Sequence, residues 1–388
     1  MNNTSKYDFV ILGGGAAGLS LAHRMMNHSY FATKKIALVE REQKTKNDRT
    51  WCFWEKGSGK YDNVVYRSWE NIHFYSKALE KKESINPYHY KMIKGIDFYN
   101  YVYAELANAS HIDIIHAEVE RIEEHENQAT IHLLDQGELT TKQVFKSYPS
   151  IDHIDSDKHI HVLQHFKGYV IETKRPTFDP ECATFMDFRI DQKGDARFLY
   201  VLPHSPTKAL VEVALFSNTL LDQPAYDKIL TDYIKDFLEI KSYCIEEEEF
   251  GVIPMSTYPF ADHNTKNIFH IGTGGGIVKA SSGYAFSRIQ KHSDQLIDAI
   301  VNGQPLKNSY NGLHGRHLFY DKIMLHAMLK NGVSGEDIFT NLFKKKNAPQ
   351  IFKFLDQETS HLEDIGIFRA PPMWPFTKSF FTLLVGNG

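Results

Sequence analysis

Four glycines within the stretch VILGGGAAGLSLAHRM, residues 10–25, constrain the fold of this chain more than any other feature. The apolar, β-favouring hexapeptide YDFVIL precedes them and predicts one buried strand. Gly13, Gly15 and Gly18 have the G-x-G-x-x-G spacing, in which the first glycine allows a tight turn and the second admits a pyrophosphate close to the backbone. The third lets a helix pack closely on the strand. The stretch therefore predicts a dinucleotide site.

A second strand and an acidic residue follow in the order expected of a nucleotide-binding fold. Residues 19–26 are predicted to be helical, and the N-terminus of this helix presents unpaired N–H groups to phosphate. Ala16, within the glycine turn, is assigned to the same cofactor site. Residues 35–39 predict the next strand. Glu40 closes it, 22 residues after Gly18, where a carboxylate accepts hydrogen bonds from a ribose diol. This order predicts a Rossmann-type domain at the N-terminus.

The composition excludes several classes of protein. The 388 residues include 44 Lys plus Arg against 48 Asp plus Glu, so the net charge of −4 favours no nucleic-acid partner. The three cysteines are far apart and predict neither disulfides nor a metal site, as in a reducing compartment. The start MNNTSKYDF lacks the pattern of a signal peptide, and no uncharged apolar run approaches the ~20 residues of a spanning helix. We expect a cytoplasmic chain, soluble or peripheral to a membrane.

The middle and the end of the chain predict two further regions. Short β-favouring segments between residues 162 and 217, joined by tight turns, indicate a separate, mainly antiparallel sheet. A strand at 268 then runs into a second glycine-rich turn, so the chain is expected to return to the nucleotide-binding domain. The predicted fold class is α/β. We assign a discontinuous Rossmann-type domain to 1–150 and 260–305, an inserted antiparallel substrate domain to 151–259, and a helical region to 306–388.

The late glycine turn, within NIFHIGTGGGIVKASSGYAF from residue 267, favours FAD over NAD. Many flavin folds place the ribitol and the isoalloxazine at such a second turn. The chain also carries, in order, the blocks GGGAAG, NDRTWCFW, MDF, FLYVLP, LVEVALFS, GVIPM, IGTGGG and SSGYAF, with FLDQETSHLEDIGIFRAPPMWPF near its end. In these blocks, which span nearly the whole chain, the sequence resembles the lycopene β-cyclases of bacterial carotenoid pathways.

The resemblance implies a flavoenzyme that catalyses no net electron transfer. The family binds FAD non-covalently and needs it reduced, with NAD(P)H as the reductant. It cyclises the linear ψ-ends of lycopene to β-rings, through γ-carotene to β-carotene. The chemistry requires an acid, a base, and a dry cavity whose electron-rich faces stabilise a carbocation. The resemblance also places four residues of the late turn on the cofactor: Gly272, Thr273, Gly274 and Gly275.

One glutamate is the candidate acid. Glu212, in ALVEVALFS, is either an exposed charge on an edge strand or a carboxyl that an apolar site keeps protonated. The resemblance favours the second interpretation, because Glu212 lies where the family's Leu-Glu-Glu-Thr or Leu-Glu-Asp-Thr motif has its first acid. Val213 and Ala214 replace the second acid and the Thr, so Asp187 in FMDFR is a substitute candidate. Adjacent strand residues face opposite sides, which leaves the alternative that Glu212 alone acts as acid and base.

Aromatic and basic residues complete the expected site. Trp51, Phe53, Trp54 and Tyr284 are assigned to the substrate cavity, although core packing explains the three residues of the NDRTWCFW block equally well. Arg49, in the same block, either contacts a pyrophosphate oxygen or forms a surface salt bridge.

Histidine is abundant, with 20 residues, but predicts no metal site. His159 and His161 share one face of a predicted strand, and His314 and His317 lie one helical turn apart. Neither pair has a third ligand nearby in the sequence, so we expect no metal.

Two other functions remain open. One is a flavin monooxygenase or prenyl-chain reductase on the same scaffold, although related hydroxylases carry Gly-Asp where this chain has Gly272 and Thr273. The other is a non-enzymatic carotenoid or lipid carrier, which would return its substrate unaltered. A substrate as apolar as lycopene implies peripheral docking on the cytoplasmic membrane. The segment PPMWPFTKSFFTLL, at 371–384, is either the docking surface or a helix that caps the core.

Overall fold

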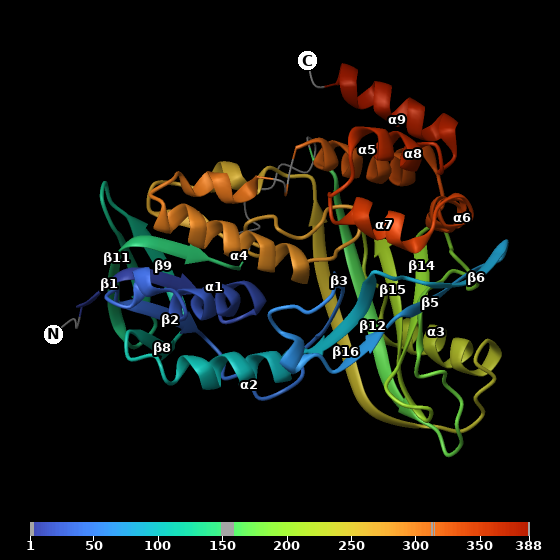
Figure 1. Ribbon diagram of the computed structural model, residues 1–388, viewed down its shortest axis with the longest axis horizontal. Helices are drawn as coiled ribbons and strands as arrows, with labels where there is room; N and C mark the ends of the chain where they lie inside the picture. Colours follow the sequence, from blue (N-terminus) through green and yellow to red (C-terminus); the bar gives the residue numbers. More distant parts are fainter. Residues whose placement is uncertain (1–3, 149–158, 312, 314, 387–388) are drawn as a thin grey trace.

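Two large sheets and a set of C-terminal helices make up the computed structural model, which describes residues 4–148, 159–311, 313 and 315–386. Figure 1 shows the first sheet near the N-terminus and the second on the opposite side of the molecule, with the C-terminal helices above it. The α/β fold expected from the sequence is confirmed.

The first sheet has parallel strands at its centre, as a nucleotide-binding fold requires. β1 pairs in parallel with β2 on one side and with β11 on the other. The end of β1, at Val10, Ile11 and Leu12, is fully buried, which explains its uniformly apolar sequence. The strands lie in the order β8 (Ile112–His116), β2 (Ile36–Glu40), β1 (Thr4–Leu12), β11 (Gly137–Lys146), β10 (Ala129–Leu133) and β9 (Val119–Glu124), and β17 (Ile268–His270) also pairs with β11.

Helices α1 (Ala16–Met26), α2 (Gly95–Leu106) and α4 (Phe286–Val301) belong to the same half of the molecule. α1 packs against α4 (Figure 1), and Arg24 of α1 donates a hydrogen bond to Asp294 of α4 at 2.5 Å. β17 and α4 thus lie in the same half of the molecule as the first sheet. α4 begins at Phe286, after the turn formed by residues 272–285.

The second sheet is antiparallel except where β13 pairs with β5. Two of its strands, β5 and β6, come from residues 71–84 rather than from the middle of the chain. The 151–259 limits of a substrate domain therefore stay a prediction. The order is β16 (Cys244–Ser256), β12 (His161–Glu172), β15 (Lys208–Ser217), β14 (Ala196–Pro203), β13 (Cys182–Asp187), β5 (Asn71–Ser76) and β6 (Leu79–Ser84).

Helices cover both faces of the second sheet. α3 (Gln223–Asp236), capped by the Asp222 side chain, packs on Val211, Val213 and Leu215. Leu210, Ala214 and Phe216 alternate with them and face the other core, which the C-terminal helices close. These helices are α5 (Arg316–Asn331), α6 (Gly335–Lys345), α7 (Ala348–Leu355), α8 (His361–Phe368) and α9 (Met373–Val385).

A small third sheet joins the two halves. It consists of β3 (Thr50–Lys56), β7 (Tyr88–Lys94) and β4 (Arg67–Trp69). Trp54 of β3 stacks on Phe352 of α7 with 4.5 Å between ring centroids, so the sheet is fixed to the C-terminal helices. Within the described part of the chain, no helix combines the length and the apolar character that crossing a bilayer needs.

Candidate active site

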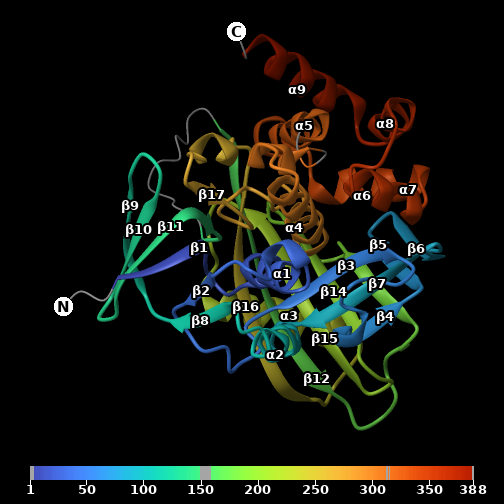
Figure 2. The same ribbon diagram turned by 60° about the vertical axis from the view of Figure 1, so that its left-hand side comes forward.

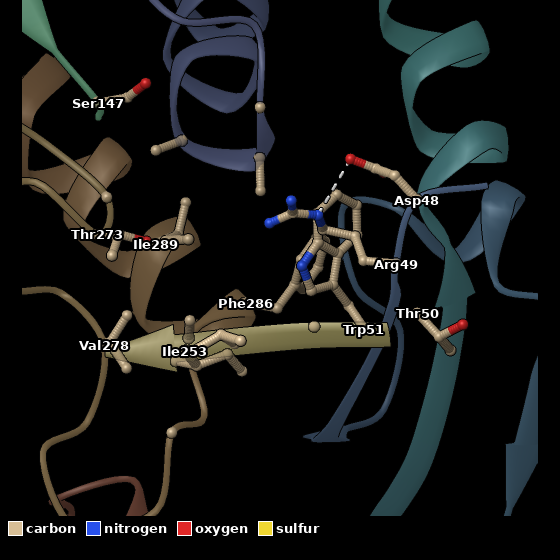
Figure 3. Close-up of a pocket in the computed structure, with 18 of the residues that line it drawn as sticks. Asp48, Arg49, Thr50, Trp51, Ser147, Ile253, Thr273, Val278, Phe286 and Ile289 are labelled. Carbon is tan, nitrogen blue, oxygen red and sulfur yellow. Dashed lines mark hydrogen bonds and ion pairs between the residues drawn. The ribbon is translucent and has the colours of Figure 1, made fainter. Parts of the chain in front are cut away.

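A cavity of about 760 Å³ runs from the glycine turns of the first sheet to the inner strands of the second. Its size is that of a typical cofactor or substrate pocket. Figure 3 shows part of its wall, where Arg49, Trp51, Ile253, Thr273 and Phe286 come from elements far apart in the sequence. A ligand that occupies this cavity therefore contacts both halves of the molecule.

The first glycine turn has the shape of a phosphate cradle. Gly13, Gly15 and Ala16 line the cavity, and no side chain caps the start of α1, so its N–H groups are open to an anion. A Cβ on Gly15 would meet no atom within 4 Å, because it would project into the cavity. Gly18 does not line the cavity. A Cβ there would lie 1.9 Å from the carbonyl oxygen of Gly13, so Gly18 allows the close helix–strand contact instead.

Glu40 and Arg49 both line the cavity at the nucleotide end. Oε2 of Glu40 accepts a hydrogen bond from the N–H of Gly14 at 2.6 Å, which holds the carboxylate at the end of β2 beside the turn. Arg49 pairs with the neighbouring Asp48 at 3.3 Å (Figure 3) and is half exposed. Both positions fit a ligand with a ribose and phosphates, while their roles stay a prediction.

The late glycine turn lies against the first. Gly272 and Thr273 line the cavity, and a Cβ on Gly272, whose φ is +58°, would lie 2.7 Å from Cβ of Ala17 in α1. Gly274 and Gly275 do not line it, because they pack on the backbone of neighbouring strands and loops. Two glycine turns that meet at one cavity fit the two ends of a dinucleotide such as FAD.

The four aromatic candidates divide into two pairs. Trp51 and Tyr284 line the cavity. The ring centroid of Trp51 lies 5.5 Å from that of Phe286 (Figure 3). Phe53 and Trp54 do not line it. Phe53 is buried, and its ring centroid lies 4.8 Å from that of Phe286. Trp54 donates its indole N–H to Asp356 at 2.8 Å. The structure places these last two in the packing around the site.

Glu212 lies at the far end of the cavity on β15, half-buried among aromatic side chains. Tyr200 is its direct partner on β14, and the Tyr200 hydroxyl lies 3.3 Å from that of Tyr284. Burial raises the pKa of Glu212 well above its usual range, and the neighbouring Glu249 carboxyl raises it further. Its surroundings therefore favour the protonated form of the Glu212 carboxyl, the form that an acid catalyst needs.

Glu249 is the functional candidate that the sequence did not single out. It belongs to the EEEE run at 246–249, which is typical of a solvated segment. In β16 the odd-numbered glutamates face inward, and Glu249 lines the cavity beside Glu212. The Thr50 hydroxyl donates a hydrogen bond to Oε2 of Glu249 at 2.8 Å. Period-two alternation through the run was the one signal in the sequence.

Neither position 213, where the family has its second acid, nor the substitute candidate Asp187 places a carboxyl in the cavity. Val213 faces the opposite side of the sheet and is buried against α3, so a carboxyl at this position would not share the cavity with Glu212. Asp187 is fully buried and does not line the cavity. Its oxygens accept hydrogen bonds from the Arg189 guanidinium at 2.5 Å and from the Tyr233 hydroxyl at 2.7 Å. Asp187 thus fixes the end of β13 to α3.

The described histidines of the two predicted pairs lie outside the lining of this cavity. His159 and His161 do not line it, and His317 is buried beside Asp364 of α8. His314 lies outside the described residues. No group of three potential metal ligands occurs among residues 4–148, 159–311, 313 and 315–386.

Solved structures of known proteins share this fold. The chain superposes on a geranylgeranyl bacteriochlorophyll reductase-like protein of Thermoplasma acidophilum with a TM-score of 0.63 at 12% identity, covering 97% of this chain and 96% of that one. A flavoprotein/dehydrogenase of Cytophaga hutchinsonii gives a TM-score of 0.60 at 12% identity, covering 99% and 100%. The fold is therefore that of the FAD-dependent oxidoreductases and monooxygenases.

Sequence comparison identifies the family within this class. The family model described as lycopene cyclase protein matches residues 8–380, so the chain belongs to that family. It is 24% identical over 321 residues to the chloroplastic neoxanthin synthase of Solanum lycopersicum, covering 78% of this chain and 62% of that protein. It is 25% identical over 230 residues to the lycopene beta-cyclase of a Paracoccus species, covering 55% and 57%. The chain thus spans less than two thirds of either relative.

Proposed function

We propose that this chain is an FAD-dependent lycopene cyclase that converts the linear ψ-ends of lycopene to β-rings, through γ-carotene to β-carotene. One observation carries the proposal: the Glu212 carboxyl, whose pKa is raised by burial, lies at the aromatic end of a cavity that begins at two glycine turns. Membership of the lycopene cyclase family supports it. The cyclisation is an isomerisation, so atoms and electrons balance without a net redox step.

The side chains around Glu212 suit a carbocation reaction. The Glu212 carboxyl donates its proton to the terminal double bond, the next double bond closes the six-membered ring, and a carboxylate removes a ring proton. Tyr90, Tyr200, Tyr284 and Trp51 offer ring faces that stabilise the positive charge and exclude water. When bound in its reduced form, FAD supplies a further electron-rich ring system, with NAD(P)H as the reductant. Gly13, Gly15, Ala16, Glu40, Arg49, Gly272 and Thr273 are the residues proposed to hold it.

The pigment formed in cells that accumulate lycopene tests this function. The wild-type chain is expected to convert lycopene to β-carotene, and the purified protein to carry FAD. Glu212→Gln keeps the shape of the side chain but delivers no proton, so turnover is expected to fall by ~10²–10⁴ with FAD content unchanged. Asp187→Asn, away from the cavity, serves as the control. Unaltered lycopene with the wild type would indicate a carrier, and one NADPH consumed per product would indicate a reductase or monooxygenase.

The surface formed by α8 and α9 is proposed to dock on the cytoplasmic membrane. In Figure 2, α9 lies at the outer edge of the molecule, and its inner side packs on α5 through Phe376. The outer side exposes Trp374, Phe381 and Val385, of which Trp374 is 78% exposed. Such a patch is where a C40 hydrocarbon would be taken up from lipid.

Sedimentation with anionic lipid vesicles tests the docking surface. The wild type is expected to sediment with the vesicles, and the double variant Trp374→Glu, Phe381→Glu to stay in solution. Leu220→Glu, at an exposed apolar residue outside α8 and α9, is the matched control. Equal sedimentation of the double variant and the wild type would contradict the assignment.

A further inference from the structure

Glu212 and Glu249 come from strands that are not neighbours, yet their side chains meet above one glycine. In the register of the second sheet, Gly168 of β12 lies opposite Glu212 of β15 on one side and opposite Glu249 of β16 on the other. A Cβ on Gly168 would lie 3.2 Å from Cβ of Glu212 and 3.3 Å from Cγ of Glu249. The missing side chain on the middle strand therefore lets the two carboxyls approach each other.

The surroundings of the two carboxyls differ. Oε2 of Glu249 accepts the hydrogen bond from Thr50, which favours the ionised form of this carboxyl. Oε1 of Glu249 is buried, and no described residue other than Glu212, whose carboxyl lies within hydrogen-bond reach of Glu249, is placed to donate to it. Two adjacent carboxylates in such a site repel each other, so one proton held between them is favourable. Glu212, to which no group of the described residues donates as Thr50 does to Glu249, is the carboxyl that retains it.

We propose, on the basis of the cyclase function above, that Glu212 and Glu249 share one proton and divide the two proton transfers of the reaction. Glu212 gives its proton to the terminal double bond and becomes a carboxylate. After ring closure, the Glu249 carboxylate accepts the proton that leaves the ring. The proton then passes from Glu249 to Glu212 across the pair, which restores the starting state with no external acid or base. Glu249 thus supplies the base, a role that a carboxyl at position 213, on the opposite face of the sheet, could not fill.

Titratable groups from three strands and the late glycine turn face the Glu212–Glu249 pair. Cys52 of β3, Tyr90 of β7, Tyr200 of β14 and Tyr284 of the late turn surround Glu212, and burial raises the pKa of each of these four groups. Near Glu249, the Glu247 carboxylate pairs with Lys94 at 2.9 Å. The thiol and the phenols stay neutral at the pH values where the carboxyls exchange their proton.

Infrared spectroscopy of the FAD-loaded protein tests the pair without any substrate. The difference between wild type and Glu212→Gln is expected to contain the C=O band of a neutral carboxylic acid at pH 7. In Glu249→Gln that band is expected to disappear at a pH at least one unit lower than in wild type, because the neighbouring negative charge is gone. Glu247→Gln, on the same face of β16, is the matched control and is expected to titrate as wild type.

The pH profile of turnover tests the division of roles. Wild type is expected to show a bell-shaped profile, and Glu249→Gln to lose ~10²-fold in kcat together with the acidic limb. An absent band at pH 7, the same titration in Glu249→Gln and wild type, or an unchanged profile would each overturn the pair. A wild-type protein that forms no cyclic product but shows the band and its shift would overturn the cyclase function and leave the shared proton standing.

Discussion

Gly168→Ala tests whether the close approach of Glu212 and Glu249 matters more for catalysis than for stability. The added Cβ would lie 2.9 Å from Cδ1 of Leu210, 3.2 Å from Cβ of Glu212 and 3.3 Å from Cγ of Glu249. Overpacking of this kind costs ~1–3 kcal/mol, and the lower flexibility of the unfolded chain returns ~0.4–1 kcal/mol. Because the end of Leu210 can move, we expect the free energy of unfolding to fall by only about 1 kcal/mol.

The rate is expected to fall further than the stability. A carboxyl displaced by ~1 Å costs ~10²-fold in rate, which corresponds to ~2.7 kcal/mol of transition-state stabilisation. Denaturant unfolding gives the first quantity, and β-carotene formed per FAD-loaded molecule gives the second. The double variant Gly168→Ala, Leu210→Val removes the closest contact, so it should regain stability but not rate. Wild-type turnover in Gly168→Ala, or turnover recovered in the double variant, would refute this reasoning.

Three further changes have expected outcomes. Gly15→Val places a side chain in the cavity, where its Cβ meets no protein atom within 4 Å, so the purified variant should be as stable as the wild-type apoprotein and lack FAD. Full flavin content would contradict the cofactor site. Asp187→Asn weakens the contacts with Arg189 and Tyr233 and should lower the free energy of unfolding, measured by denaturation, by ~1.5–3 kcal/mol. In the pigment assay, the FAD-loaded molecules should keep their turnover. Because the pKa of Glu212 is raised in the folded state, the folded protein keeps a proton that the unfolded chain releases above pH ~4.3. The free energy of unfolding therefore falls as the pH rises, by ~1.4 kcal/mol per pH unit for one proton. Glu212→Gln should therefore be more stable than wild type at pH 8 and equally stable at pH 4. A difference in the free energy of unfolding between the two proteins that is the same at both pH values would contradict the raised pKa of Glu212.

The cofactor end of the site follows from local sequence signals. Glycine spacing, strand periodicity and the acid at the end of the second strand depend on neighbouring residues, so Gly13, Gly15, Glu40 and the late turn at Gly272 could be placed before the structure was known. The same alternation correctly separates the faces of β15, with Val213 against α3 and its neighbours in the other core.

The second carboxyl could not be found in this way. In the EEEE run, Glu246 pairs with Lys208, Glu247 with Lys94 and Glu248 with Lys167, as expected of a charged surface strand. Only the register across three strands brings the fourth glutamate opposite Gly168. Such long-range pairing leaves no trace in a single sequence.

The position of Asp187 was equally hidden. An aspartate in an aromatic strand is compatible with a cavity or with a buried ion pair. Hydrogen bonds from Arg189 and from Tyr233, a residue of α3 that is 46 positions away in the sequence, hold Asp187 in the buried ion pair. The same holds for Phe53 and Trp54, whose partners Phe286 and Phe352 come from late in the chain.

The mass of the carotenoid formed in heavy water tests the central claim most directly. The purified, FAD-loaded protein with NADPH and lycopene should give in ordinary water a product of the same mass as lycopene. In heavy water the product should gain one deuterium for each ring formed, because the attacking proton comes from the Glu212 carboxyl, which exchanges with the solvent between turnovers. A product that differs from lycopene by two hydrogens in ordinary water, or a cyclic product without deuterium, would contradict acid-catalysed cyclisation.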